Sequence, residues 1–313
     1  MNLKPIFCTG AGTTPVDSGL PDVGRIFAVR PDGDLLWYQY LGNGVADRRG
    51  ATGWEGHSGS AIGNGWGGFL ALLGGGDGVV LAVQPDGALL WYQYTGDGKA
   101  DRSGGTGWTP GSSNQIGRGW QGFRHLFVTP MEGHGNGITV FAVERDGDLR
   151  WYRYNGDGRA DPTGGTGWHP NSGNLVGNGW AGFQRIVGTG AGIFAVEPNG
   201  DLRWYRYDGS GQADVSGATG WPPNSGSVIG NGWAGFSDLT GCSTDRGGFA
   251  AMLFAVSENG DMRWYRYDGH GEPDRSGATG WHANSGNIIG NGWLGRRAPG
   301  STLADATRPW SVT

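Results

Sequence analysis

The sequence predicts an all-β fold, a five-bladed β-propeller of four-stranded antiparallel blades, from three observations. One motif is written five times along the 313 residues: it opens with Trp-Tyr-x-Tyr, reaches a second tryptophan 17 residues later and a third 12 residues beyond that. Its copies run over Trp37–Trp66, Trp91–Trp120, Trp151–Trp180, Trp204–Trp233 and Trp264–Trp293. Each copy contains about four short strand-like segments separated by glycine-rich turns, and helical periodicity is absent. A fixed repeat of this length is typical of stacked units such as propeller blades.

The residues that precede each Trp-Tyr-x-Tyr, together with that motif, predict a β-hairpin. In the third copy, Phe141–Glu144 is a β-branched and aromatic run, Arg145–Gly147 is a turn, and Asp148–Tyr154 alternates in polarity. The same turn carries Asp32-Gly33, Asp86-Gly87, Asn199-Gly200 and Asn259-Gly260 in the other copies. Asp-Gly and Asn-Gly tolerate the positive φ of a two-residue hairpin loop. Rings fall on both faces of the second strand, so we expect neighbouring blades to cover both faces.

The second half supplies a polar loop and two more strands. Asn155–Asp161 is the loop, and an Asn-rich stretch at His169–Asn174 follows the middle tryptophan. We expect a short strand from Leu175 and a further strand over Ala181–Val187 that leads into the next copy.

The repeats span nearly the whole chain, so we expect residues 1–313 to form a single domain. Residues 296–313 do not follow the template and form a C-terminal tail whose packing is left open. Lys4–Phe7 stands where the strand after Trp293 is expected, which predicts that the N- and C-terminal segments close the ring by completing one blade together. The connections of variable length, Thr9–Gly24, Gly188–Gly192 and Gly241–Ala251, should lie together on one face.

Charge and composition exclude several classes of partner. The formal net charge is −5, charged residues make up 16% of the chain, and basic runs are absent, which argues against nucleic acid and anionic membrane surfaces. No apolar run has membrane-spanning length. The N-terminal residues lack the features of a signal peptide, so we expect a cytoplasmic protein or one secreted without a recognisable signal peptide. Cys8 and Cys242 are expected to be free buried thiols, with a disulfide between them as the alternative.

The repeat resembles that of the tachylectin-type lectins, five-bladed propellers in which a tryptophan is followed a dozen residues later by Ile-Gly-x-Gly-Gly-Trp-x-x-Phe. The matching pieces are Gln115–Phe123 after Trp108, Trp180–Phe183 after Trp168, and Trp233–Phe236 after Trp221. The resemblance covers about residues 4–294. Before the middle tryptophan this chain has Thr-Gly, where the family has Asp-Asn.

What the resemblance implies is a multivalent carbohydrate-binding protein. It implies recognition of N-acetylhexosamine glycans, of the N-acetylglucosamine or N-acetylgalactosamine type, in one shallow pocket per repeat between neighbouring blades. It further implies no metal, no cofactor and no catalysis. The oligomeric state is left open.

The middle segment of each repeat holds the residues expected at a sugar site, because a pyranose needs an aromatic face and a few fixed polar groups. The aromatic candidates are the middle tryptophans, Trp54, Trp108, Trp168, Trp221 and Trp281. The polar candidates are Asn114, Asn171, Asn224 and Asn284, and the aspartates after the polar loop, Asp47, Asp101, Asp161, Asp214 and Asp274. Each set also has a structural interpretation: the tryptophans could pack between blades, and the aspartates could hold turns.

Other classes of function have weaker support. The loop Asn155–Asp161 is similar to calcium-binding loops, but its acidic positions change from copy to copy. Arg150 and its counterparts Arg203 and Arg263 are expected to stack on rings or pair with carboxylates. A propeller glycoside hydrolase would need a carboxylate pair, which the glutamates do not clearly offer. A protein-interaction scaffold would use the variable connections. We therefore expect a lectin and not an enzyme.

Overall fold

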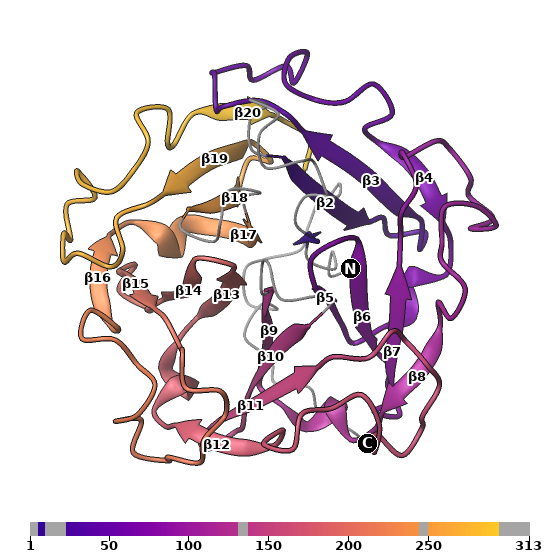
Figure 1. The fold of residues 1–313 in the computed structure, drawn as a ribbon. Coiled ribbons are helices and arrows are strands. Elements are labelled where there is room, and N and C mark those ends of the chain that lie inside the picture. The colour runs from indigo at the N-terminus through magenta and orange to yellow at the C-terminus, as the bar shows by residue number, and fades with distance from the viewer. Residues whose placement is uncertain (1–5, 10–22, 131–136, 244–249, 294–313) are drawn as a thin grey trace, which may run out of the picture.

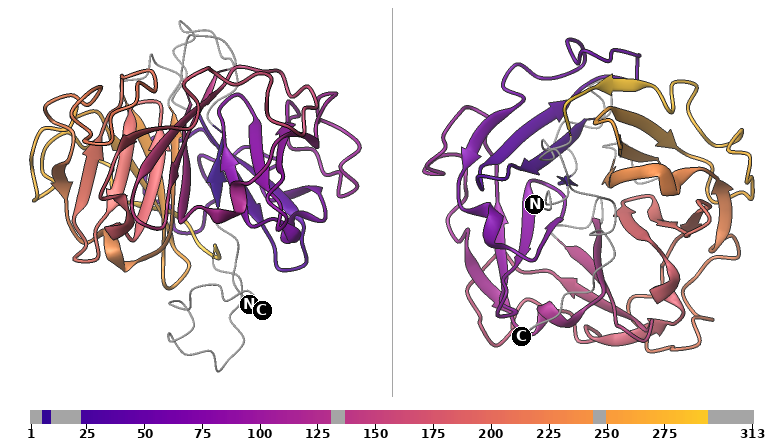
Figure 2. Two further views of the ribbon diagram at one scale, coloured as in Figure 1. Left: turned by 90° about the horizontal axis from the view of Figure 1, so that it is seen from below. Right: turned by 180° about the vertical axis from the view of Figure 1, so that it is seen from behind.

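In the computed structural model, which describes residues 6–9, 23–130, 137–243 and 250–293, five antiparallel sheets stand around a central axis (Figure 1). Each sheet has four strands and forms one blade, and its strands follow one another in sequence from the axis outwards. Figure 2 shows the same ring from its edge and from behind. The predicted all-β propeller of five four-stranded blades is confirmed.

The strands are assigned to blades as follows. Blade 1 contains β1 (Phe7–Cys8), β2 (Gly24–Val29), β3 (Leu35–Tyr40) and β4 (Ser60–Gly63). Blade 2 contains β5 (Ala71–Gly74), β6 (Val79–Val83), β7 (Leu89–Gln93) and β8 (Asn114–Gly117). Blade 3 contains β9 (His125–Pro130), β10 (Ile138–Val143), β11 (Leu149–Tyr154) and β12 (Asn174–Gly177). Blade 4 contains β13 (Arg185–Thr189), β14 (Gly192–Val196), β15 (Leu202–Tyr205) and β16 (Ser227–Gly230). Blade 5 contains β17 (Phe236–Ser243), β18 (Ala251–Ser257), β19 (Met262–Tyr267) and β20 (Ile288–Gly290).

The predicted hairpin is present, but its turn differs from the predicted two-residue loop. Val143 pairs with Leu149, the Glu144 N–H donates to the Asp148 carbonyl at 2.8 Å, and the Gly147 N–H donates to the Glu144 carbonyl at 3.1 Å. Gly147 has φ +100°, whereas Asp146 is not among the residues with positive φ. The turn is therefore a longer one that ends in a left-handed glycine, so the conformation requires glycine at one position and leaves the preceding residue in ordinary backbone.

The third tryptophan of each of the first four copies begins a three-residue 3₁₀ turn. These turns are η1 (Trp66–Gly68), η2 (Trp120–Gly122), η3 (Trp180–Gly182) and η4 (Trp233–Gly235). The strand expected over Ala181–Val187 therefore starts later, at Arg185. The 3₁₀ turn carries the chain from the rim of one blade to the inner strand of the next.

The hydrophobic core lies between neighbouring blades. One buried cluster joins Leu81 and Trp91 of blade 2 to Val140 and Tyr154 of blade 3. The polar loop of blade 3 lies directly on this core, because a Cβ built on Gly158 would come within 2.1 Å of Cε3 of Trp91. The same close approach recurs between Gly44 and Trp264, Gly98 and Trp37, Gly211 and Trp151, and Gly271 and Trp204. The first tryptophans thus pack between blades.

Each polar loop is also hydrogen-bonded to the outer strand of the preceding blade. The Asp161 N–H donates to the Gln115 carbonyl at 2.8 Å, and Nε1 of Trp168 donates to the Ile116 carbonyl at 2.9 Å. The ring closes with the same pair of bonds, from Asp47 N to the Ile288 carbonyl at 2.8 Å and from Trp54 Nε1 to the Ile289 carbonyl at 2.9 Å.

The ring closes where the N- and C-terminal blades meet, but the two ends do not complete one blade together as expected. β1 pairs with β2 in blade 1, and β20 is the outer strand of blade 5. The strand after each third tryptophan is the inner strand of the next blade. Among the described residues, each blade is therefore built from four consecutive strands.

The expectation of free thiols is wrong, because Cys8 and Cys242 form a disulfide with their Cα atoms 5.3 Å apart. The two cysteines are 234 residues apart in sequence. β1 and β17 are neighbouring inner strands at the closing junction, so closure of the ring brings the cysteines together. Beside them, the Ile6 N–H donates to Oδ2 of Asp238 at 2.9 Å.

Some expectations concern residues that the structure does not describe. The tail at 296–313 lies outside the described residues, as do most of the variable connections Thr9–Gly24 and Gly241–Ala251. In the part of the chain that is described, no helix is long and apolar enough to cross a bilayer.

Candidate functional site

Every junction between neighbouring blades carries the same three rings, called here the aromatic trio. It consists of the tyrosine after the first tryptophan and the middle tryptophan of one repeat, with the third tryptophan of the preceding repeat. At the closing junction the trio is Tyr38, Trp54 and Trp293, with ring centroids 4.5 Å apart for Tyr38 and Trp293 and 5.5 Å for Trp54 and Trp293. The other trios are Tyr92, Trp108 and Trp66; Tyr152, Trp168 and Trp120; Tyr205, Trp221 and Trp180; and Tyr265, Trp281 and Trp233.

A recess opens beside the trio at the junction of blades 5 and 1, called here the closing recess. It has a volume of about 740 Å³, and its lining includes all three rings of the trio and Ser58. Trp54 is only partly buried, so its indole forms part of the recess wall. An aromatic wall with polar groups close to it is the arrangement that a pyranose requires.

The middle tryptophans also hold the ring together. As in Trp54 and Trp168, Nε1 of the other three donates to a backbone carbonyl of the preceding blade. Trp108 donates to Ile62 at 3.3 Å, Trp221 to Val176 at 3.0 Å and Trp281 to Ile229 at 3.0 Å. The indole N–H is therefore occupied within the protein, and the ring face is the part that a ligand could use.

The predicted asparagines lie at the same junctions, and their amide groups position the next polar loop. Nδ2 of Asn171 donates to the Ser210 carbonyl at 2.9 Å, and Nδ2 of Asn284 donates to the Asn43 carbonyl at 2.9 Å. Asn224 donates in the same way to His270 at 3.3 Å. Asn114 occupies a different register and donates to the Gly158 carbonyl at 2.8 Å, as Asn174 does to Gly211.

The predicted aspartates hold the turn of the polar loop. Oδ1 of Asp101 accepts from the backbone and hydroxyl of Ser103, and Oδ2 accepts from the backbone and hydroxyl of Thr106. These hydrogen bonds lower the pKa of Asp101 to about 2, and the bond from the Ser103 hydroxyl has the largest effect. The equivalent bonds lower the pKa of Asp214 to about 2. The pKa values of Asp47, Asp161 and Asp274 are lowered by the same kind of hydrogen bonds. Direct contact of these carboxylates with a sugar stays a prediction.

Ser58 and its counterparts have a similar structural role. Oγ of Ser58 accepts from the Gln39 N–H at 3.1 Å, which ties the segment after the middle tryptophan to the hairpin strand. The counterparts are Ser112, Ser172, Ser225 and Ser285, each accepting from a backbone N–H at 3.0–3.1 Å.

The tyrosine of each trio was not among the residues predicted for the site. Alternation along Trp-Tyr-x-Tyr placed it opposite the first tryptophan, but only the folded ring shows that this face meets the neighbouring repeat. Burial raises the pKa of Tyr205 and of Tyr265 to about 12 and raises that of Tyr38, Tyr92 and Tyr152. The hydroxyls consequently remain neutral hydrogen-bonding groups at ordinary pH.

Arginines that follow the hairpin turn were expected to stack on rings or pair with carboxylates. Two of the three pair with carboxylates. Nε of Arg150 lies 2.5 Å from Oε1 of Glu144, and Nε of Arg203 lies 2.8 Å from Oε1 of Glu197. In blade 5 the counterpart of Glu144 is Ser257, and Nη1 of Arg263 donates to the Gly286 carbonyl at 2.6 Å.

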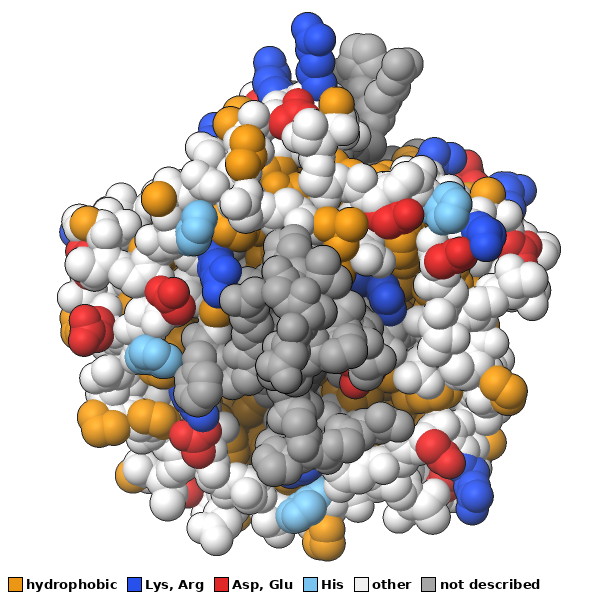
Figure 3. Space-filling model, turned by 45° about the horizontal axis from the view of Figure 1, so that its top comes forward, with side chains coloured by type: hydrophobic (Ala, Val, Ile, Leu, Met, Phe, Trp, Pro, Cys, Tyr) orange, Lys and Arg blue, Asp and Glu red, His pale blue; other side chains and the backbone are white. Residues whose placement is uncertain are grey.

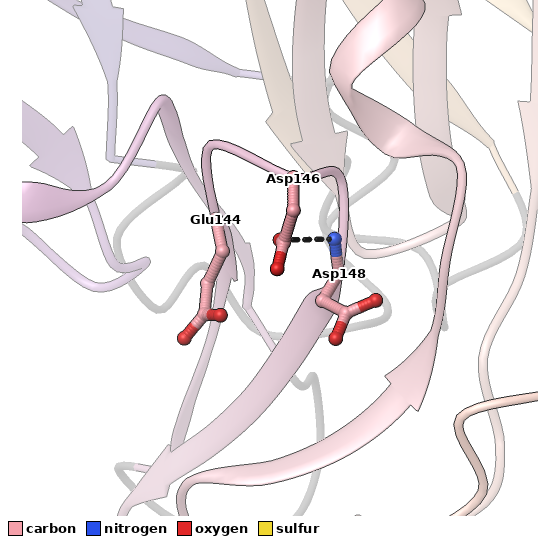
Figure 4. Close-up of side chains that lie close together, drawn as sticks. All are labelled: Glu144, Asp146 and Asp148. Atoms are coloured by element: carbon pink, nitrogen blue, oxygen red, sulfur yellow. Dashed lines mark hydrogen bonds between the residues drawn. The ribbon is translucent and has the colours of Figure 1, made fainter.

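One acidic group of three residues lies at the β10–β11 turn (Figure 4). The carboxylates of Glu144, Asp146 and Asp148 are within 4.8 Å of one another. Oδ1 of Asp146 accepts from the Asp148 N–H at 3.1 Å, and Glu144 is paired with Arg150. These partners explain the cluster as part of the hairpin turn. In the face seen in Figure 3, acidic and basic side chains are intermixed around the rim.

Comparison with known proteins identifies one family. The family model described as Tachylectin matches residues 16–154 and 142–297. No curated protein matches the sequence.

Several solved structures share a weak overall similarity. The BP39L lectin from Burkholderia pseudomallei is 16% identical over 90% of this chain and 69% of its own, with a TM-score of 0.41. The lectin of Aleuria aurantia, described as a six-bladed β-propeller with a novel fucose recognition mode, is 12% identical over 93% of this chain and 97% of its own, with a TM-score of 0.45. AofleA from Arthrobotrys oligospora is 12% identical over 89% of this chain and 71% of its own, with a TM-score of 0.40. Similarity at this level does not bear on the ligand of this chain.

Proposed function

This chain belongs to the Tachylectin family of carbohydrate-binding propellers, and we propose that it binds N-acetylhexosamine glycans in one recess per repeat. The observation that carries the proposal is the recurrence of the aromatic trio at all five junctions. In this proposal, the partly buried indole of the middle tryptophan stacks on the apolar face of the sugar, and the tyrosine hydroxyl and neighbouring backbone groups serve its hydroxyl and acetamido groups.

One sugar site at each junction of a rigid ring would favour binding to dense glycans. A single shallow site is expected to be weak, but sites that engage one surface together gain about 10²- to 10⁴-fold in avidity without any new contact. This supports a role for the protein as a multivalent lectin.

We also propose that the chain is not an enzyme. The middle tryptophans and the aspartates of the polar loops recur in every repeat, whereas catalysis needs a singular constellation of acid, base or nucleophile. Among the described residues, the Glu144, Asp146 and Asp148 cluster is accounted for by its turn and by Arg150.

Of the two locations expected from the sequence, we propose secretion. The Cys8–Cys242 disulfide supports this choice, because disulfides persist in oxidising compartments and are rare in the cytosol.

Titration with monovalent sugars tests the proposed function. Calorimetry with N-acetylglucosamine and N-acetylgalactosamine should give a stoichiometry near the number of junctions for the preferred sugar. Trp168→Phe should lower that stoichiometry by about one site, because the smaller ring offers less stacking surface at the junction of blades 2 and 3.

The matched control is Trp151→Phe, which shrinks a first tryptophan that packs between blades and whose counterpart Trp37 does not line the closing recess. It should leave the stoichiometry unchanged, with folding of both variants checked by circular dichroism. One site per chain in the wild type, or no binding of either sugar, would contradict the proposal.

A further inference from the structure

The closing recess carries two arginines that have no basic counterparts in the other four repeats. Arg30 and Arg49 both line it. The position of Arg30 is occupied in the other repeats by Gln84, Glu144, Glu197 and Ser257, and that of Arg49 by Ser103, Thr163, Ser216 and Ser276.

Neither guanidinium has a hydrogen-bonding or ion-pair partner in the described part of the chain. Arg30 and Arg49 are both exposed, and no hydrogen bond or ion pair of either side chain is found there. This differs from Arg150 and Arg203, which are paired with Glu144 and Glu197. The charge of Arg30 acts on the Tyr38 hydroxyl, where it opposes the rise in pKa that burial causes. Arg30 and Tyr38 both line the closing recess.

One carboxylate, that of Glu55, also lines the closing recess. Its Oε2 accepts from the His57 N–H at 2.6 Å and lies 3.8 Å from Nδ1 of the same residue. The lining thus presents two cations against one anion, and the anion already has a partner.

Among the described residues, the closing recess has no counterpart of an aromatic side chain that lies at the other four junctions. A phenylalanine three residues after the third tryptophan contacts both that tryptophan and the tyrosine of the trio at the other four junctions. These residues are Phe69, Phe123, Phe183 and Phe236. In the fifth copy the sequence has Arg296 at this position, which lies outside the described residues. Trp293 is less buried than the other third tryptophans.

We propose that the closing recess binds an anionic saccharide, a sugar bearing a carboxylate or sulfate, held by Arg30 and Arg49 while its ring stacks in the aromatic trio. Guanidinium groups form paired, charge-assisted hydrogen bonds with both kinds of anion. The inference rests on the proposed sugar-binding function and adds a second ligand class to it. The junction of blades 2 and 3 carries Arg118 and Arg145 beside the Glu144–Arg150 pair, so the test is directed at residues of the closing recess alone.

The test uses N-acetylglucosamine and its 6-sulfate, two probes that differ only by the anionic group, with methyl glucuronide as the carboxylate probe. The variant is Arg30→Gln/Arg49→Ser, which installs the residues of the second repeat. It is expected to fold, because Ser103 at the equivalent position makes the same turn with Asp101. The wild type should bind at least one anionic probe more tightly than the neutral sugar, with affinity that falls as salt rises.

In the double variant, calorimetry should show one fewer site for that anionic probe, or a loss of at least about tenfold in affinity at one site. The matched control is Arg124→Gln/Arg159→Gln, which removes the same charge from exposed positions that do not line the closing recess, and it should bind as the wild type does. Equal binding of the anionic probe by wild type and double variant, or equal loss in the control, would overturn the inference. If the wild type binds an anionic probe but does not bind the neutral sugar, the result would instead count against the N-acetylhexosamine proposal alone.

Discussion

A single carboxylate in each polar loop accepts several hydrogen bonds, and this makes the aspartate the central residue of the loop. Asp101 accepts two backbone N–H groups and two hydroxyls from Ser103 and Thr106. Since these bonds favour the charged form, the pKa of Asp101 falls to about 2. The loop in turn places the middle tryptophan on the wall of its recess.

The lowered pKa makes loop stability depend on pH. A depressed carboxyl pKa contributes stability that is complete above the unfolded value of about 3.9 and is lost as pH falls towards 2. Asp101→Asn should therefore be less stable than the wild type at pH 7, and this difference should shrink between pH 4 and pH 2. Urea unfolding across that range measures it.

Asp157→Asn provides the comparison, because Oδ1 of Asp157 accepts one long hydrogen bond, from the Arg159 N–H at 3.3 Å. Its stability difference should be smaller at pH 7. A difference for Asp101→Asn that stays constant down to pH 2 would show that its carboxylate does not stabilise the loop.

Among the elements, the polar loop connects blades as well as strands. It lies on the first tryptophan of the preceding repeat and is hydrogen-bonded to the outer strand of that blade. The glycine at the closest approach, Gly158 in blade 3, has φ +76° and leaves no room for a side chain.

Gly158→Ala should destabilise the protein by about 2–5 kcal/mol, since it combines left-handed backbone strain with a clash against Trp91. Gly179 is a matched control: its φ is +81°, but nothing lies within 4 Å of a Cβ built there. Gly179→Ala should cost about 1–2 kcal/mol, from strain alone. Chemical denaturation compares the free energies of unfolding of the two variants. Equal losses of stability would mean that the packing of the polar loop against the Trp91 indole does not constrain the fold.

For the whole molecule, the closing junction uses the contacts of the internal junctions and adds a covalent bond. Asp47 and Trp54 bond to β20 as their counterparts bond to other outer strands, and an ion pair of 2.9 Å joins Arg48 to the buried Asp261. Equivalent pairs join Arg102 to Asp34 and Arg275 to Asp201. Internal blades are also held by chain connectivity, whereas blades 1 and 5 are the two ends of the chain.

The Cys8–Cys242 disulfide replaces that missing connection, so its removal should weaken the ring as a whole. Cys242→Ser should lower the free energy of unfolding by about 2–5 kcal/mol, because the bond closes a long loop in the unfolded chain. Urea unfolding without reductant measures the loss. Wild type treated with reductant should match the variant, and a variant as stable as the oxidised wild type would contradict this role.

Five copies of Trp-Tyr-x-Tyr, Gly-Trp and Gly-x-Gly-Trp with constant spacing inside each copy were sufficient to predict the number of blades, the hairpins and the middle tryptophans at the junctions. This is because propeller blades are local units whose strands are consecutive in sequence. The disulfide, the assignment of β1 to blade 1, the tyrosines of the aromatic trio and the charge of the closing recess could not be inferred in that way. Each depends on which residues of the first and last blades come together, and proximity across a closed ring is set by the curvature of the packed blades rather than by spacing along the chain.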